Sequence, residues 1–164
     1  MKRINLILLS CLFLFSAFTI IDTIQWQIAD DYEIRFSGSG AQGTFSGLKG
    51  TLVFDENNLA ASSMNVSVEV STISTGSNLQ NKHAKNSDWF NEKKYPQIKF
   101  NSNRFKKTTN GYEVKGDLEL HGTVKQVTIP FTFESKTGSG VFVGSLSVNR
   151  EDYGIDGPWL RGAF

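Results

Sequence analysis

The sequence predicts an all-β domain, either an antiparallel sandwich or an antiparallel barrel. Apolar and polar residues alternate with a period of two in several runs, glycine or asparagine turns separate many of these runs, and one segment has a helical pattern instead. The 15 glycines and three prolines are dispersed over 164 residues, as the turns of an all-β protein would place them.

The first 21 residues have the pattern of a secretory signal peptide. Lys2 and Arg3 form a short basic start, and an almost wholly apolar run follows from Ile4 to Ile21. A membrane anchor is the alternative, because the run is close to the ~20 residues that a bilayer span needs. A short basic start followed directly by a β pattern favours export, with cleavage between residues 16 and 23. We therefore expect a periplasmic or secreted protein without a stable membrane span after cleavage.

The remaining chain, residues 22–164, has the length of a single domain. The only cysteine, Cys11, lies inside the signal region, so no disulfide is expected in the mature protein. Removing Lys2 and Arg3 from the 17 basic residues leaves 15 against 16 acidic residues. This balance provides no basic surface for nucleic acid.

Four runs alternate clearly and predict strands with one apolar and one solvated face. Their apolar members are Tyr32, Ile34 and Phe36; Met64, Val66, Val68 and Val70; Val114, Leu118 and Leu120; and Val127, Ile129, Phe131 and Phe133. Further strands are expected at 24–28, 44–55, 97–105 and 140–149, and turns at Asn110-Gly111 and His121-Gly122.

The segment from about 78 to 90 is predicted to be a short helix. Ser77 and Gln80 fit a capping box, in which Ser77 is the N-cap and Gln80 reaches back to it. Leu79, His83 and Ala84 would then share one side of the helix. A helix inserted over one end of an antiparallel barrel is compatible with a ligand container, since about eight strands enclose space for a small ligand.

Three motifs resemble the YceI-like family. They are Asp88–Phe100, Gly116–Lys125 and Asn149–Ile155, and weaker matches extend from about Trp26 to Gly157. The resemblance implies a lipocalin-like antiparallel barrel of about eight strands. Its long hydrophobic channel would hold a polyisoprenoid or similar lipid in the periplasm.

The chain departs from the family pattern at several positions. Many members have an Arg-Asp pair at Gln80-Asn81, a leucine at Ala84 and a phenylalanine at Trp89. Members also run through another strand after the Asn149–Ile155 motif, whereas this sequence ends at Phe164. The resemblance therefore leaves open a barrel in which the last strand is missing.

The function implied by the resemblance is non-catalytic binding, storage or transport of a long apolar lipid, either polyisoprenoid-like or a fatty-acid derivative. A homodimer stays an open alternative. The expected tunnel lining is Phe36, Leu52, Phe54, Val66, Val68, Trp89, Phe90, Phe100, Leu118, Leu120, Ile129 and Phe131. His83, Asp88 and Arg150 are the candidate polar residues, for contact with a lipid headgroup or for a structural role.

The residues themselves leave two other functions open. A lipid-modifying hydrolase or isomerase could use His83 and Asp88 as an acid–base pair, although such a pair more often fixes a helix or a loop. A structural β-domain with a filled core is the other alternative, because protein interiors are close-packed. No residue cluster in the sequence predicts catalysis or a cofactor. His83 and His121 lack a third nitrogen or sulfur ligand for a metal, and His121 is interpreted as a turn residue that hydrogen-bonds its hairpin.

Overall fold

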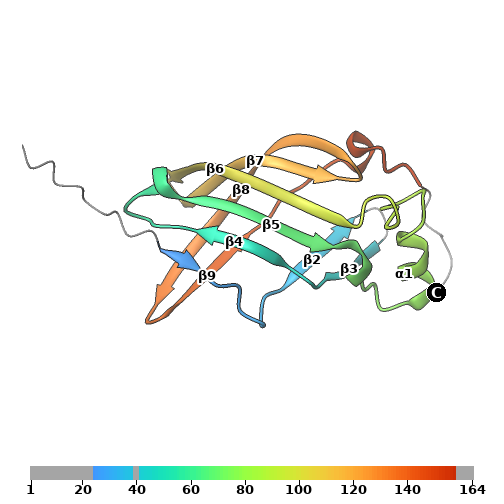
Figure 1. Ribbon diagram of the computed structural model, residues 1–164, viewed down its shortest axis with the longest axis horizontal. Coiled ribbons are helices and arrows are strands. Elements are labelled where there is room, and N and C mark those ends of the chain that lie inside the picture. Colours follow the sequence, from blue (N-terminus) through green and yellow to red (C-terminus); the bar gives the residue numbers. More distant parts are fainter. Residues whose placement is uncertain (1–23, 39–40, 158–164) are drawn as a thin grey trace, which may run out of the picture.

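The computed structural model describes residues 24–38 and 41–157 (Figure 1). The predicted signal peptide at 1–21, its cleavage region and the chain end at 158–164 lie outside the described residues. Export, the domain start at residue 22 and a missing last strand therefore stay predictions. Within the described part of the chain, no helix is both long enough and apolar enough to cross a membrane.

Seven strands form one antiparallel sheet that curls into a nearly closed barrel (Figure 1). In sheet order they are β1 (Gln25–Trp26), β4 (Lys49–Val53), β5 (Ser63–Glu69), β6 (Gln97–Thr108), β7 (Gly111–Leu120), β8 (Thr123–Lys136) and β9 (Ser139–Gly144). Two further strands, β2 (Ile34–Gly38) and β3 (Ala41–Phe45), form a separate hairpin. The predicted antiparallel barrel with one short helix is thus confirmed.

The alternation in the sequence matches the two faces of the barrel wall. Along β7 the residues Tyr112, Val114, Leu118 and Leu120 are buried, and charged residues such as Glu113 and Asp117 lie between them. Along β8 the odd-numbered residues from Val127 to Phe133 face the interior, and their neighbours are exposed. The period of two therefore predicts the interior face of both strands.

Several predicted boundaries are wrong, and three of these differences change the reading of an element. The expected strand at 44–55 is two strands, because the chain leaves the hairpin at Ser46–Leu48, where Gly47 has a φ of 74°, and only then joins the main sheet as β4. The expected strand at 140–149 ends at Gly144. The expected helix at 78–90 ends at Ala84.

The helix α1 (Asn78–Ala84) begins as predicted, because the Ser77 side chain accepts a hydrogen bond from the Gln80 backbone N–H at 3.4 Å. It ends early because the chain folds back on itself. The backbone N–H of Phe90 bonds to the carbonyl of Ala84 at 3.0 Å, and that of Asn91 bonds to Asn86 at 2.9 Å. Asn86, Ser87 and Asp88, which follow shortly after Ala84, favour turns over a helix interior.

Two hydrophobic clusters form the core. The larger one lies inside the barrel and includes Phe54, Phe100 and Leu118. The smaller one packs the hairpin against α1 through Phe45, Ile73 and Ala84. Phe90 and Ile98 pack against both clusters, which therefore meet at these two residues.

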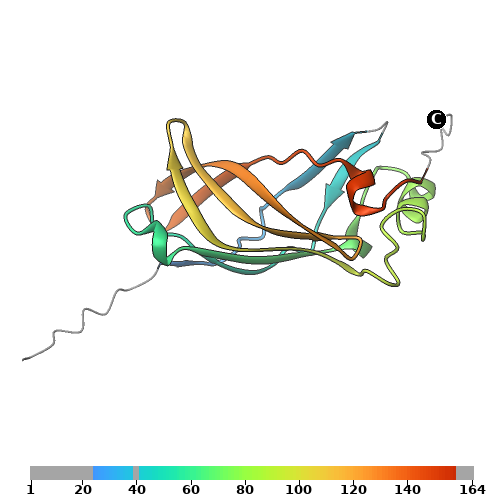
Figure 2. The ribbon, with the colours of Figure 1, turned by 90° about the horizontal axis from the view of Figure 1, so that it is seen from above.

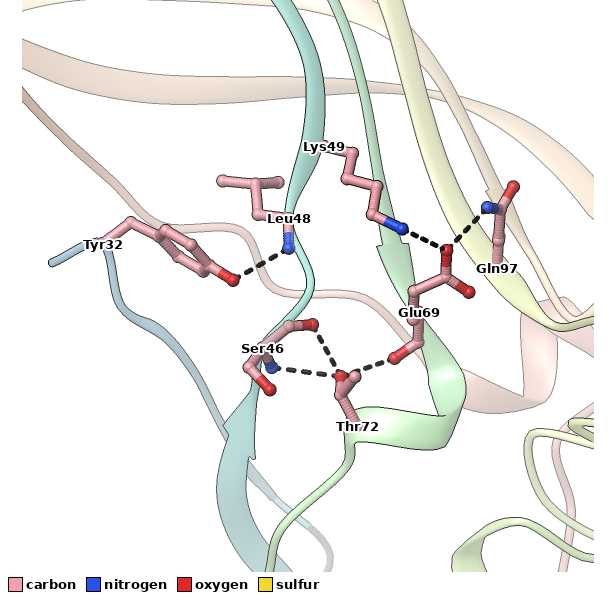
Figure 3. Close-up of polar contacts among 7 residues, drawn as sticks. All are labelled: Tyr32, Ser46, Leu48, Lys49, Glu69, Thr72 and Gln97. Carbon is pink, nitrogen blue, oxygen red and sulfur yellow. Dashed lines mark hydrogen bonds and ion pairs between the residues drawn. The ribbon is translucent and has the colours of Figure 1, made fainter. Parts of the chain in front are cut away.

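Polar contacts fix the junction between the hairpin and the barrel (Figure 3). The Thr72 hydroxyl accepts from the Ser46 N–H at 3.1 Å and lies 2.6 Å from the Ser46 carbonyl oxygen. The Tyr32 hydroxyl accepts from the Leu48 N–H at 2.9 Å. Short 3-10 turns lie nearby at η2 (Val70–Thr72) and elsewhere at η1 (Leu59–Ala61) and η3 (Arg150–Tyr153).

Candidate functional site

A pocket of about 320 Å³ lies at the α1 end of the molecule, between the hairpin strand β2 and the segment that follows β9. Figure 2 shows this segment passing alongside the hairpin before it enters η3. Apolar side chains form much of the wall, namely Phe36, Trp89, Phe90, Leu120, Val148 and Ile155. The volume falls within the ~300–1,000 Å³ of small-molecule pockets, which are mostly apolar with a few polar groups.

Trp89 and Arg150 form one wall of this pocket as a stacked pair. The Arg150 guanidinium carbon lies 4.8 Å from the centre of the Trp89 ring, and the Trp89 side chain is only 2% exposed. The Trp89 indole N–H donates to Nε2 of His83 at 2.9 Å. A cation stacked on an indole face is a favourable arrangement that also fixes both groups in place.

Arg150 has a structural role in η3. Its Nη1 donates to the carbonyl oxygens of Ile155 at 3.2 Å and Gly157 at 2.8 Å, and these two bonds close the loop after η3. A guanidinium has five N–H donors. Arg150 also lines the pocket, so its guanidinium combines this structural role with a place at the candidate site.

The end of the β7–β8 hairpin positions η3. Lys125 on β8 lies 3.5 Å from the Asp152 carboxylate, and its ammonium group lies 5.8 Å from the centre of the Tyr153 ring. Burial of the Tyr153 side chain, followed by the charge of Asp152, raises the pKa of the Tyr153 hydroxyl. These contacts hold Arg150 at one place on the pocket wall.

His121 lies in the β7–β8 turn, as predicted, but its partner is not the hairpin. Its Nδ1 lies 3.1 Å from the carbonyl oxygen of Tyr153, and because a carbonyl only accepts, Nδ1 carries the proton. Its ring meets the Tyr95 ring edge-on at 4.8 Å. Nε2 is buried without a hydrogen-bond partner among residues 24–38 and 41–157. His121 therefore joins the turn to η3 outside the pocket lining.

The structure gives His83 and Asp88 different partners. The His83 ring accepts from the Trp89 indole, while the Asp88 carboxylate accepts from the Ser87 hydroxyl at 3.0 Å. The Asp88 backbone carbonyl also accepts from the Gly157 N–H at 3.0 Å, which joins the turn after α1 to the end of the described chain. The contacts of His83 and Asp88 therefore hold the turn after α1 in place.

The predicted lining residues lie at different depths in the barrel. Phe36, Trp89, Phe90 and Leu120 line the pocket, together with Arg150. Leu52, Val66, Val68 and Ile129 are partly buried against the two clusters, and Phe54, Phe100, Leu118 and Phe131 belong to the buried core.

Sequence reasoning missed six pocket residues, namely Ser37, Gly38, Val148, Asn149, Glu151 and Ile155. The last three lie within the Asn149–Ile155 motif, so the motif itself is the signal that could have identified them. Val148 lies just before it, in a segment that was expected to be strand and carries no such signal.

A second pocket, of about 420 Å³, lies against β2, β3 and the Ser74–Gly76 loop and is lined mostly by small or polar residues such as Arg35, Gln42 and Thr44. It contains one predicted residue, Phe36, which lines both pockets. The candidate site is therefore the first pocket, where the predicted residues come together.

Comparisons with known proteins agree with these observations. A UPF0312 protein of Photorhabdus laumondii is 39% identical over 87 residues, which are 53% of this chain and 45% of that protein. Protein YceI of Escherichia coli is 34% identical over 116 residues, 62% of this chain and 61% of that protein. The chain thus spans about half to three fifths of the length of these curated relatives.

Solved structures have the same fold. Burkholderia cenocepacia BcnA matches with a TM-score of 0.67 and 26% identity, over 74% of this chain and 77% of that chain. The YCEI protein of Campylobacter jejuni matches with a TM-score of 0.62 and 20% identity, over 94% of this chain and 85% of that chain. The family model of the YceI-like domain matches residues 21–162 of this chain. This protein belongs to the YceI-like domain family.

Proposed function

We propose that this protein binds, stores or transports an apolar lipid in the periplasm and leaves the lipid chemically unchanged. The observation that carries the proposal is the pocket at the α1 end, whose apolar wall residues Trp89, Leu120 and Ile155 belong to the cluster inside the barrel. The pocket therefore shares part of its wall with the hydrophobic core.

We expect a lipid tail to cover apolar residues of the barrel wall that are only partly buried. Val66, Ile98, Val127 and Ile129 pack against the interior cluster and are only partly buried. Covering apolar surface stabilises a complex by about 25 cal/mol per Å². A chain that packs against these residues would therefore bind through burial, without a charged site.

The polar groups of the pocket suit a headgroup contact. Arg150 presents N–H donors beside the apolar wall, and Asn149 and Glu151 flank it. A carbonyl, carboxylate or phosphate oxygen is the natural partner of a guanidinium N–H. The contacts of His83 and Asp88 described above favour structural roles, so we assign neither residue to chemistry.

Solvent extraction of protein purified from its native host, followed by mass spectrometry, tests the proposal directly. We expect an intact lipid to co-purify, and a mature N-terminus that begins between residues 16 and 23. A lipid recovered in chemically altered form would instead support the hydrolase or isomerase. Intact Met1 in a cytoplasmic fraction would contradict export.

A substitution at Leu120 tests whether the pocket is the site. Leu120 lines the pocket, so Leu120→Trp should fill it, and lipid loading should fall sharply while the melting temperature of delipidated protein stays unchanged. In a filled core the same change would overpack and destabilise by ~1–3 kcal/mol. Val124→Trp is the matched control, because Val124 lies on the neighbouring strand and its side chain is 59% exposed. If Leu120→Trp is destabilised and the wild-type protein carries no lipid, the barrel has a filled core and the proposal is wrong.

A further inference from the structure

The hairpin formed by β6 and β7 contains a β-bulge. The register of the two strands shifts between Asn101 and Arg104, where two residues of β6 lie across from one residue of β7, Gly116. A β-bulge of this kind re-aims the side chains that follow it. Beyond the bulge, Phe105 packs against the interior cluster, and its exposed neighbours Arg104 and Lys106 point outward.

Specific contacts hold the bulge in place. The Ser102 hydroxyl donates to the Lys115 carbonyl oxygen, and it accepts from the Arg104 backbone N–H at 3.0 Å. Gly116 lies so close to β6 that a Cβ there would collide with the Asn101 carbonyl oxygen and the Ser102 side chain. These contacts fix the backbone that places Arg104 directly opposite Lys115.

The bulge thereby sets two like charges side by side. Arg104 and Lys115 are directly opposite each other on the outer face of the hairpin, and both are exposed. Within residues 24–38 and 41–157, neither of them forms an ion pair. Like charges at directly opposite positions of an antiparallel pair destabilise the sheet. An anion bound across both side chains would relieve this repulsion, so the arrangement favours an anionic partner.

Two further cations lie beside this pair. Lys106 and Lys107 follow on β6 and are also exposed. The only carboxylate between Ser102 and Lys115 is that of Glu113, which lies 3.6 Å from the Lys106 ammonium group. Four cations against one carboxylate give this hairpin segment a charge of +3, whereas the whole chain has a net charge of +1. Positive charge is therefore concentrated on this hairpin.

The neighbouring strands leave this charge exposed. The residues of β8 that pair with Glu113 and Lys115 are Pro130 and Thr128, which are uncharged, and β5 pairs with β6 only up to the bulge. Asp117, the next outward residue of β7, lies beyond the bulge. Figure 2 shows the turn of this hairpin at the end of the molecule opposite α1, where it rises above its neighbours. The outer face is therefore accessible to a large partner.

We propose that the outer face of the β6–β7 hairpin docks on the surface of a membrane that contains anionic lipids. We name Arg104, Lys106 and Lys115 the basic patch. Its partners are the lipid phosphates, which accept hydrogen bonds from guanidinium and ammonium groups and attract basic residues near the surface. A membrane suits this patch because its cations are exposed on a raised hairpin, which a broad surface reaches from outside. The inference stands independently of the proposed function.

Flotation of the purified protein with lipid vesicles tests the docking. Vesicles that contain phosphatidylglycerol should carry the protein with them at low salt, and vesicles of phosphatidylcholine alone should not. High salt should release the protein, because exposed charges are screened. Inorganic phosphate should release no more protein than sodium chloride of the same ionic strength. Selective release by phosphate would indicate a site for a small anion and would overturn the proposal.

Charge variants should change vesicle binding in both directions. The loss of one cation near an anionic surface weakens partitioning about fivefold. The double variant Arg104→Gln with Lys115→Gln should therefore bind about 25-fold more weakly. Glu113→Gln should bind more tightly, because it removes the carboxylate beside the basic patch. A gain in binding cannot result from unfolding, so this variant keeps the test decisive.

The matched control is the double variant Lys82→Gln with Lys93→Gln. It removes two exposed cations on and after α1, at the other end of the molecule, and should bind like the wild type. Melting curves establish which variants are folded. Absence of wild-type binding to phosphatidylglycerol vesicles, binding that does not depend on lipid charge, or an equal loss in the control variant would overturn the proposal.

Discussion

At the scale of single residues, the Glu69 carboxylate joins three neighbouring strands. It lies on β5, accepts from Gln97 on β6 at 3.0 Å and lies 3.4 Å from the ammonium group of Lys49 on β4 (Figure 3). The Gln97 hydrogen bond and then the Lys49 contacts lower the pKa of Glu69, whereas its partial desolvation acts in the opposite direction. The folded state therefore favours the ionised carboxylate.

This shift predicts a pH dependence of stability. Because the pKa is lower in the folded state, Glu69 stabilises the fold above its ordinary pKa, and this contribution is lost as the pH falls through the lowered value. Glu69→Gln should lower the melting temperature modestly at neutral pH and have little effect in the acid range. Melting curves across pH measure this. Glu33→Gln, which breaks an exposed contact with Arg35, is the control and should change little. A decrease in melting temperature for Glu69→Gln that is the same at all pH values would contradict the expected pH dependence.

Residue roles were predictable where the partner is local and unpredictable where the chain folds back. Ser77 caps α1 as its sequence indicates. The sequence suggests a pair of His83 with Asp88, but α1 ends at Ala84, and the turn that follows brings the Trp89 indole to the His83 ring. The stacking of Arg150 on Trp89 joins segments 61 residues apart in the sequence, and no local pattern indicates it.

At the scale of elements, two hairpins end in two-residue turns whose second residue is a glycine with a positive φ. Gly122 connects β7 to β8 with a φ of 74°, and Gly138 connects β8 to β9 with a φ of 75°. His121, before Gly122, also has a positive φ of 51°, as the first central residue of a type I′ turn requires. The two glycines differ in surroundings, since a Cβ at Gly122 would collide with the Tyr95 ring and one at Gly138 would meet open space.

This difference predicts unequal effects of the same substitution. Gly138→Ala should cost about 1 kcal/mol, because only the left-handed backbone is strained. Gly122→Ala should cost ~1–3 kcal/mol more, because Tyr95 must also move. Urea denaturation of both variants measures the free energies of unfolding. Equal decreases in the free energy of unfolding would mean that the Tyr95 ring can move aside without an energetic penalty.

The elements that the sequence misplaced are those whose limits depend on distant partners. The alternation from 44 to 55 predicts one strand. In the structure, however, Thr44 pairs with Ser74, and the residues from Lys49 pair with β5. The chain changes sheets at Gly47, and nothing in the alternation marks that point. In contrast, the alternating residues Val114–Leu120 of β7 and Val127–Phe133 of β8 were predicted with the correct faces.

At the scale of the whole molecule, the barrel is closed by side chains where its two terminal strands meet. Within the described residues β1 pairs only with β4, and β9 only with β8. Trp26 of β1 packs on Phe133 of β8 and Phe142 of β9, and Gly140 leaves room for its ring. Closure therefore depends on ring packing, which a sequence pattern does not reveal, and on the Trp26 hydrogen bond to the Phe54 carbonyl.

Two substitutions at Trp26 separate these contributions. Trp26→Phe retains a ring but removes the indole donor, and should cost about 1 kcal/mol as a lost hydrogen bond to a buried carbonyl. Trp26→Ala also removes the ring that bridges β1 and β9, and should cost ~3–5 kcal/mol. Because the ring holds the edge of β9 against the barrel, hydrogen exchange of the β9 amides should become faster in Trp26→Ala and change little in Trp26→Phe. Amides of β6 and β7, which have partners on both sides, are the internal control. Unchanged β9 protection in a folded Trp26→Ala variant would show that the pairing of β9 with β8 holds this side of the barrel without the help of β1.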